Sequence, residues 1–520
     1  MELLQVTLFL LLCAVALGWI ARHFSFPYPI ALVIGGGVLG FVPGLPEFPF
    51  DPEFILVLVL PPILYQEALL TSWRDFKANI RPIGLLAIGL VIATTLAVGV
   101  TLKLLIPQCP WSVAFVLGAI VSPPDAVAAT AILSRLNIPR RVVVVLEGES
   151  LVNDASGLVL YKFAVAAVMT GAFSLLDASV QFVGVAAGGI ALGALLAWIF
   201  VAIHRRLGDT FIEVLTTLAV PYVAYIAAES VHVSGVLAVV AAGLVRGRYA
   251  PEIVSAEMRI IARSVWNLLV FLLNSLIFML IGLQLSDVVE RLSGAATLRE
   301  LFLYGAFVSA VAIAVRFAWV YPAMYLPYRL SATVHNHAPG PSAAETFIMG
   351  WCGMRGIVSL AAALALPRVF ADGTPFPQRD LIIFLTFVVI AVTLVLQGLT
   401  LPPLIRRLKV GADWSLHEEH QYARTALGAA AHAAIDALAQ RENMPPDLAA
   451  RVRAEFAEKI ARAFADGPAP DNSGEPGRRL RQAAIKAERQ ELIRIWRENH
   501  ISDDILHHIE EDLDYQESHI

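Results

Sequence analysis

The stretch AFVLGAIVSPPDAVAATAIL at residues 114–133 decides the fold. Apart from Thr130, its polar residues gather at its centre, where Ser122, two prolines and Asp125 follow one another. Adjacent prolines remove two backbone donors and block the helix before them, so carbonyls near Ser122 lose their intrahelical partners. Inside a bilayer, such loose backbone is tolerated only where it is buried in protein or lines a cavity. The stretch therefore predicts a membrane helix that is interrupted at mid-depth beside a carboxylate.

The composition of the whole chain fits this prediction. The 520 residues are 58% hydrophobic and only 16% charged, against roughly 25% charged in a typical soluble domain. Apolar runs long enough to cross a hydrocarbon core recur before residue 410, which predicts an all-α polytopic membrane protein with about thirteen spans. The runs lie near 3–21, 29–44, 53–70, 82–105, 112–134, 143–170, 178–203, 211–228, 232–248, 264–285, 300–325, 344–366 and 380–405.

Several classes of function are disfavoured by the same composition. A net charge of -5 without a basic stripe makes nucleic acid a poor partner. Cys13, Cys109 and Cys352 lie too far apart in the sequence for a disulfide framework or a metal motif. No nucleophile or phosphate-loop motif occurs, so we expect neither an enzyme nor a cofactor.

The distribution of Lys and Arg predicts the topology. Alternate loops hold 17 of these residues, whereas the other set of loops holds 5. Because cytoplasmic loops carry the excess of positive charge, the N-terminus is expected outside and the tail in the cytoplasm, with the protein in the plasma (inner) membrane. The first apolar run lacks a basic segment before it and is interpreted as a retained span.

The chain changes character near residue 410. We divide it into a transmembrane domain at 1–409 and a tail at 410–520, whose helix-forming, charged sequence is interrupted by the turn-rich linker GPAPDNSGEPG at 467–477. The tail is predicted to be a small helical cytoplasmic appendage. It serves either folding and assembly or regulation.

Seven ionisable residues fall deep inside the apolar runs. Each costs about 2.5 to 3.5 kcal/mol at the centre of a membrane helix on insertion scales, so each needs a partner, a water-filled cavity or a function. These residues are Glu67, Asp125, Glu149, Asp154, Lys162, Arg316 and Arg355.

The sixth run presents several polar groups together. Ser150 and Asp154 are four residues apart and share one helical face, while Glu149 and Asn153 form a neighbouring stripe. Asp154 lies about midway across the membrane, at nearly the depth expected for Asp125. The two carboxylates are therefore predicted to meet.

The twelfth run is a second interrupted span. Gly350, Gly353 and Gly356 surround Arg355 near its middle. An interrupted span in each half of a membrane protein indicates an inverted-repeat transporter with a site at the midplane. Since Arg355 is always charged, we predict that it forms a structural ion pair with Glu149.

The remaining intramembrane charges leave alternatives open. Glu67 follows a second Pro-Pro and is either a gate or accessory ligand, or a carboxylate that reaches the cytoplasmic interface. Arg316 is expected to snorkel toward the cytoplasmic end of its span. Lys162 is either paired with a carboxylate or in contact with solvent.

Three segments carry a family resemblance. SPPDAVAA at 122–129, EGESLVNDASGLV at 147–159 and GMRGIVSLAAAL at 353–364 resemble the signature segments of bacterial sodium/proton antiporters of the NhaP type, the electroneutral branch of the monovalent cation:proton antiporter superfamily. LPPILYQEAL at 60–69 and GVLAVVAAGLV at 235–245 also match. Segment 479–492 is similar to tails in a bacterial subgroup.

This resemblance implies a fold and a set of roles. The fold is two inverted repeats of six spans plus a linking span, with core helices at about 82–170 and 300–405 that move against dimer-forming scaffold helices at about 1–70 and 178–285. A homodimer is expected. The resemblance implies that Asp154 is the cation- and proton-binding carboxylate, with Asn153 beside it. Asp125 would be the polar centre of the point where the two interrupted helices cross. Ser150 would be an auxiliary ligand, Glu67 the third-span acid, and Glu149 with Arg355 the stabilising ion pair.

One departure from the resemblance concerns the ligands. Many relatives have Thr directly before the crossing Asp, but this chain has Pro124, so Ser122 or a water is expected to substitute for the missing hydroxyl. Hard cations prefer such oxygen ligands.

Together these residues predict a secondary transporter that exchanges a monovalent cation, Na⁺ first, for H⁺ by alternating access. With Asn153 rather than a second Asp, one cation per proton is expected. Li⁺ or K⁺ as the transported ion, a cation channel, and a membrane sensor with a regulatory tail are the alternatives.

Overall fold

The computed structural model covers the whole chain and describes most of it. The described residues are 2–23, 28–42, 57–133, 136, 138–171, 175–292, 297–330, 340, 342–370, 373–410, 414–461 and 474–518. Within them the regular secondary structure is helical, apart from an isolated bridge between Val369 and Pro375. Parts of the predicted runs near 29–44 and 53–70 extend into residues 43–56 and lie outside the described residues.

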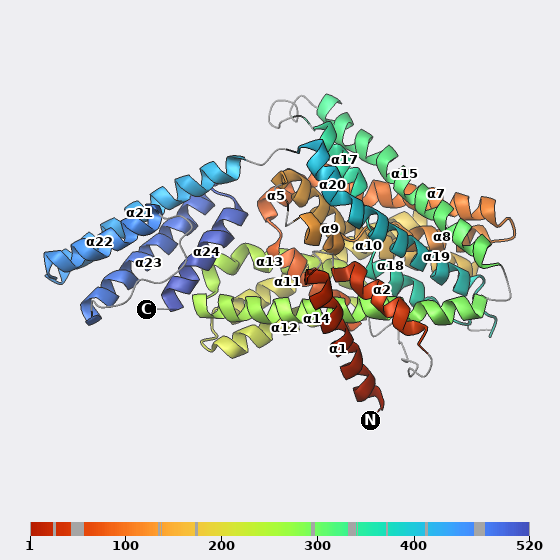
Figure 1. Cartoon of the computed structure of the whole chain (residues 1–520), viewed down its shortest axis with the longest axis horizontal. Coiled ribbons are helices and arrows are strands. Elements are labelled where there is room, and N and C mark those ends of the chain that lie inside the picture. Colours follow the sequence, from red (N-terminus) through yellow and green to blue (C-terminus); the bar gives the residue numbers. More distant parts are fainter. Residues whose placement is uncertain are drawn as a thin grey trace. The chain divides into compact units, whose positions relative to one another are not determined.

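The helices follow one another in the order of the predicted apolar runs (Figure 1). In the first half they are α1 (Glu2–His23), α2 (Tyr28–Gly40), α4 (Leu60–Leu70), α5 (Trp73–Ala78), α6 (Ile80–Gly84), the π-helix η1 (Leu85–Leu90), α7 (Val91–Leu105), α8 (Trp111–Val121), α9 (Ala126–Leu133), α10 (Arg140–Thr170), α11 (Leu175–His204) and α12 (Thr210–Ser230). In the second half they are α13 (Gly235–Ile253), α14 (Ala256–Leu292), α15 (Leu298–Leu330), α17 (Ala343–Trp351), α18 (Ile357–Leu364), α19 (Arg379–Val392), the π-helix η2 (Thr393–Gln397) and α20 (Gly398–Leu408), followed by the tail helices α21 (Trp414–Arg441), α22 (Pro446–Ala461), α23 (Gly474–Arg497) and α24 (Asp503–Ser518).

Both predicted interruptions are confirmed. The fifth run is divided into α8 and α9 by residues 122–125, and the twelfth run is divided into α17 and α18 by residues 352–356. The Pro-Pro pair explains the first break, because neither proline can donate to the helix before it. The glycines around Arg355 weaken the second.

The helix lengths fit a multi-pass membrane protein. Among the described residues, seven helical segments are long and apolar enough to cross a bilayer, by length and composition. Shorter apolar helices occur at Leu8–Ala21, Tyr28–Gly40 and Trp111–Val121. The interrupted spans fall below the length of a full crossing helix because each is divided in two.

The chain forms two compact units. The first comprises Met1–Phe200, Leu218–Gly247 and Asn267–Ala412, and the second comprises Val201–Thr217, Arg248–Trp266 and Asp413–Ile520. The second unit thus joins the tail to one end of α13 and the beginning of α14. This grouping of the tail with segments before residue 410 was not foreseen from the sequence.

In the part of the tail that the structure describes, four helices pack around an apolar core of their own. Neighbouring pairs among α21, α22, α23 and α24 pack together, as the blue bundle in Figure 1 shows. Leu480, Leu492 and Leu506 are fully buried there. Of the predicted linker 467–477, residues 467–473 lie outside the described residues, and residues 474–477 form the first turn of α23. The linker therefore ends earlier than the turn-forming composition suggested.

Close helix packing in the first unit depends on glycine. A Cβ on Gly36 of α2 would lie 2.2 Å from the carbonyl oxygen of Met279 on α14, and one on Gly282 would lie 2.3 Å from the carbonyl oxygen of Val33. Gly36 and Gly282 thus allow α2 and α14 to pack closely within one chain.

Candidate ion-binding site

A small cavity lies at the level of the two interrupted helices. Its walls come from α4, the 123–127 segment, α10 and the beginning of α18. From α4, Leu60, Ile63 and Leu64 contribute apolar side chains to the lining. The polar residues that line it are Glu67, Asp125, Ser150, Asp154 and Ser359. Three carboxylates predicted from the sequence are thereby brought to one cavity.

Asp125 connects the two interrupted helices. Its Oδ1 accepts a hydrogen bond from the backbone N–H of Val127 at 2.8 Å, and its Oδ2 accepts one from Ile357 N–H at 3.4 Å. These donors belong to the first turns of α9 and α18, where backbone N–H groups lack intrahelical partners. Asp125 N–H also donates to the carbonyl of Met354 at 2.7 Å. One carboxylate therefore caps two helix N-termini at the crossing.

Gly356 makes this arrangement possible. A Cβ at this position would lie 1.6 Å from Oδ2 of Asp125, which no side chain could tolerate. On the other side, a Cβ on Gly157 of α10 would lie 3.0 Å from the ring of Pro123. Gly157 and Gly356 thus allow α10 and α18 to approach closely the broken segment, residues 122–125 between α8 and α9.

The guanidinium of Arg355 neutralises the partial negative charge at the C-terminal ends of α8 and α17. Its Nε donates to the carbonyl of Val121, the last residue of α8, at 3.0 Å, and its Nη1 donates to the carbonyl of Gly353. Its backbone N–H donates to Oγ1 of Thr393 at 3.0 Å. A cation suits these positions because carbonyls at a helix C-terminus carry partial negative charge. The crossing therefore places Asp125 at two N-termini and Arg355 beside carbonyls left free where α8 and α17 end.

The predicted ion pair between Glu149 and Arg355 is wrong. Glu149 instead accepts two hydrogen bonds from Arg316, at 2.6 Å from Nη1 and 2.9 Å from Nη2. Arg316 also donates to the carbonyl of Met349, at 3.1 Å from Nε and 3.0 Å from Nη2. Both side chains are enclosed, with Arg316 0% and Glu149 1% exposed.

The reason for this error is the length of α15. The apolar run at 300–325 predicts a span that ends at residue 325, close enough for Arg316 to snorkel to its cytoplasmic end. The helix runs from Leu298 to Leu330, so Arg316 lies near its middle and cannot reach an end. Arg316, assigned no function from the sequence, is the partner that Glu149 needs.

Two further predicted ligands lie beside the cavity and do not line it. Nδ2 of Asn153 donates to the carbonyl of Pro124 at 3.5 Å, which supports the broken segment. The hydroxyl of Ser122 donates to the carbonyl of Ala119 at 3.0 Å. Ser122 thus uses its hydroxyl within its own helix end, whereas Ser150 lines the cavity.

Lys162 has a partner far along the sequence. Its Nζ lies 3.1 Å from Oε2 of Glu229, and 63% of the lysine side chain remains exposed. Glu229 also accepts a hydrogen bond from Gly235 N–H at 3.3 Å. Both alternatives from the sequence, an ion pair and solvent contact, therefore apply at once.

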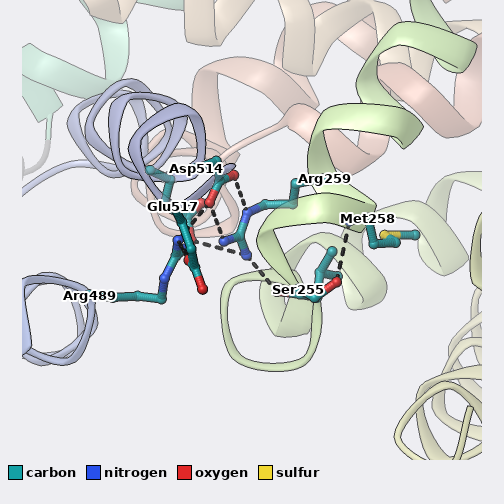
Figure 2. Close-up of polar contacts among 8 residues, drawn as sticks. Ser255, Met258, Arg259, Arg489, Asp514 and Glu517 are labelled. Atoms are coloured by element: carbon teal, nitrogen blue, oxygen red, sulfur yellow. Dashed lines mark hydrogen bonds and ion pairs between the residues drawn. The ribbon is translucent and has the colours of Figure 1, made fainter. Parts of the chain in front are cut away.

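A second group of charges lies in the second unit, where the tail contacts the beginning of α14. Arg259 donates to both carboxylate oxygens of Asp514, at 2.7 Å each, and Arg489 donates to Asp514 and Glu517 at 2.8 and 2.7 Å (Figure 2). The guanidinium of Arg248 lies 4.6 Å from the ring centroid of Trp496. We call Arg259, Arg489, Asp514 and Glu517 the tail cluster.

Fold and site together define a class of protein. Two interrupted membrane helices cross within a bundle, and their broken segment faces a cavity lined by carboxylates. This arrangement is typical of secondary transporters, in which discontinuous helices form an ion site near the middle of the membrane.

Comparisons with known proteins specify the family. The model of the family described as sodium/hydrogen exchanger, transmembrane, matches residues 8–407. An uncharacterised Na⁺/H⁺ exchanger of Mycobacterium tuberculosis is 34% identical, over 98% of this chain and 95% of its own length. A sodium, potassium, lithium and rubidium/H⁺ antiporter of Bacillus pumilus is 38% identical, over 82% of this chain and 65% of its own length.

The fold has a match among solved structures. The sodium proton antiporter MjNhaP1 of Methanocaldococcus jannaschii covers 78% of this chain with a TM-score of 0.62 at 22% identity, and 99% of that structure is covered. This chain belongs to the sodium/hydrogen exchanger family. It is a multi-pass membrane antiporter of the NhaP type, and the predicted class of cation/proton exchange is confirmed.

Proposed function

We propose that the chain exchanges Na⁺ for H⁺, one for one, with Asp154 as the carboxylate that binds either ion. The observation that carries this proposal is the cavity in which Asp154, Asp125, Glu67 and Ser150 meet. Carboxylate and hydroxyl oxygens are the ligands that hard cations prefer, and no sulfur lines the cavity among the described residues.

The carboxylates have different freedom to bind ions. Both oxygens of Asp125 accept hydrogen bonds from helix N-termini, so its charge is engaged in holding the crossing together. Glu149 is engaged by Arg316. Asp154 is 6% exposed and lines the cavity. It is therefore the carboxylate best placed to exchange a proton for a cation, and Glu67 is an accessory acid on the opposite wall.

Coupling follows from the cost of moving charge. An unneutralised Asp154 is expensive to carry through the hydrophobic interior, so the core helices move only when the carboxylate holds a proton or a cation. We assign about 82–170 and 300–405 to this moving core, and about 1–70 and 178–285 to a scaffold through which two copies form a homodimer. With Asn153 beside Asp154, each cycle carries one cation one way and one proton the other.

Two further assignments complete the proposal. The excess of Lys and Arg in alternate loops supports an orientation with the N-terminus outside the cell and the tail in the cytoplasm, in the plasma (inner) membrane. Li⁺ and K⁺ are additional candidate substrates, because the Bacillus pumilus relative is named for sodium, potassium, lithium and rubidium exchange.

The test uses purified protein in proteoliposomes with a pH-sensitive dye. Asp154→Asn should abolish proton movement driven by Na⁺ because the amide holds neither ion as a carboxylate does. Asp436→Asn, in the tail, removes an exposed carboxylate and should leave exchange unchanged. Retention of exchange by Asp154→Asn would overturn the assignment.

Stoichiometry has its own measurement. An imposed membrane potential should not change the final Na⁺ and H⁺ distribution if one charge moves each way. A shift of that endpoint with voltage would reject electroneutral exchange, and proton-independent cation currents would favour a channel.

A further inference from the structure

Ser359 is a polar residue of the cavity that the sequence pattern alone does not mark as a site residue. It is the third residue of α18, it is 1% exposed, and it lines the cavity with Asp154. Its hydroxyl has no hydrogen-bond partner among the described residues. A buried hydroxyl without a partner costs free energy, so such a group calls for a ligand.

The broken helix explains why this hydroxyl is available. A serine within a membrane helix usually donates to the carbonyl four residues earlier, as Ser309 does to Gly305 at 2.7 Å. For Ser359 that residue is Arg355, which precedes the first turn of α18 and lies in the interruption. The usual acceptor is therefore not presented in helical geometry.

Other hydroxyls and side chains near the break are differently placed. Ser122 donates to Ala119, and Pro124 has no side-chain oxygen. The cavity therefore has two serine hydroxyls on its walls, from Ser150 on α10 and Ser359 on α18. Ser359 lines the same cavity as Asp125 and Asp154 but comes from the second interrupted helix, so a cation bound there can be reached from both interrupted helices.

We propose that Oγ of Ser359 is a direct ligand of the transported cation, a proposal that rests on the function assigned to Asp154. The chemistry of a hydroxyl gives it a distinct role. A carboxylate binds a proton or a cation, whereas a serine hydroxyl coordinates a hard cation and takes up no proton at physiological pH. Ser359 thus stabilises the cation-loaded state and leaves the proton-loaded state unchanged.

The experiment compares Ser359→Ala with wild type in proteoliposomes. The apparent KM for Na⁺ should rise about tenfold, a typical effect of losing one hydrogen-bond-strength interaction. The maximal rate at saturating Na⁺ and its dependence on pH should remain unchanged, because proton binding is unaffected. Ser359→Thr keeps the hydroxyl and should stay near the wild-type KM.

A matched control separates ligation from packing. Ser309→Ala removes another buried hydroxyl, on α15, that does not line the cavity. It should leave the KM for Na⁺ at the wild-type value. An unchanged KM in Ser359→Ala, or an equal loss in Ser359→Ala and Ser309→Ala, would overturn the proposal.

Two additional arms keep the outcome decisive. If Ser359→Ala does not yield folded protein, Ser359→Cys retains the volume and replaces the hard oxygen with a soft sulfur, so it should show the same rise in KM. Asp154→Asn is measured in parallel. Exchange lost in Asp154→Asn with normal KM in Ser359→Ala rejects only the role of Ser359, whereas exchange retained in Asp154→Asn rejects the function itself.

Discussion

Two groups of paired charges, one in each compact unit, are built from the same residue types under different conditions. In the first unit, Glu149 and Arg316 are enclosed, with exposed fractions of 1% and 0%. In the tail cluster, Arg259 and Asp514 are 13% and 4% exposed, but Arg489 and Glu517 rise to 19% and 52%. The first is one bidentate pair, whereas the second is a network that reaches solvent.

The difference shows how burial changes the meaning of an ion pair. Removing a charged group from water costs several kcal/mol. The attraction between Glu149 and Arg316 therefore mainly offsets the cost of desolvating the pair itself. Loss of either partner leaves the other without compensation. In the tail cluster, solvent can replace a lost partner, and salt screens the attraction. The expected effect of a substitution therefore decreases from the enclosed pair to the pairs that face solvent.

The largest effect is expected at the enclosed pair. Glu149→Gln leaves the guanidinium of Arg316 without a counter-charge and should destabilise the protein by about 3–5 kcal/mol. The measurement is the midpoint of thermal unfolding in detergent. The double variant Glu149→Met with Arg316→Met should recover part of this loss, but not all, because Arg316 also donates to the Met349 carbonyl.

The same pair allows a direct test of partner choice. Double-mutant cycles should give a larger coupling free energy between Glu149 and Arg316 than between Glu149 and Arg355. Equal couplings, or a larger coupling with Arg355, would contradict the pairing seen in the structure.

A smaller effect is expected in the tail cluster. Arg259→Ala removes two charge-assisted hydrogen bonds to Asp514 and should cost about 1.5–3 kcal/mol of local stability. Hydrogen exchange of the α24 amides would report the change. Arg259→Lys keeps the charge but loses the two-pronged geometry, so it should restore only part of the protection. Protection equal to wild type in Arg259→Ala would show that the cluster does not hold α24.

Glu510, next to the tail cluster, gives a pH dependence. Burial raises the pKa of its carboxyl above the usual 4.5, although Arg259, His507 and Arg489 lower it and Asp514 raises it further. Since the folded-state pKa exceeds the unfolded one, the stabilisation is complete below the unfolded pKa and is lost as the pH rises through the folded pKa. The stability of Glu510→Gln relative to wild type should therefore increase with pH across that range.

Thermal unfolding at a series of pH values, with hydrogen exchange of α24 corrected for intrinsic rates, would check this expectation. A difference between Glu510→Gln and wild type that does not change with pH would show that Glu510 titrates alike in the folded and unfolded tail.

The smallest effect is expected at a pair that faces solvent. Arg453 and Asp436 join α22 to α21 at 3.1 Å, with 42% and 47% of their side chains exposed. Arg453→Ala should change the free energy of unfolding by about 0–1 kcal/mol, and less in high salt. A loss as large as that of Arg259→Ala would mean that exposure does not govern these pairs.

The sequence predicted which intramembrane charged residues need an explanation better than it predicted which of them form ion pairs. Asp125, Asp154 and Glu67 were selected because each interrupts an apolar run, and the structure brings all three to one cavity. Glu149 was assigned to Arg355 because both were placed at the same depth. The depth expected for each residue depends on where its span begins and ends. Because α15 ends five residues later than the predicted span, Arg316 was not recognised as the partner of Glu149.

The tail shows a similar limit. Its helices follow from composition, but the contact of Arg259 with Asp514 joins residues 255 positions apart. No local sequence pattern predicts a contact between residues so far apart in the chain. Ser359 was missed for a related reason: a serine in an apolar run is common, and only its position after the break leaves its hydroxyl without the usual acceptor.

By itself, the sequence determined the membrane class, the two interrupted helices and the few charges that need an explanation, because hydrophobic length, proline and buried charge act locally. Tertiary structure decided which charges pair, which carboxylates share the cavity, and which helix ends Asp125 and Arg355 neutralise. Those choices depend on distances between helices far apart in sequence, and electrostatic energies depend steeply on distance and burial. The sequence supplies the residues of the site, and the packing of the helices determines which of those residues contact one another.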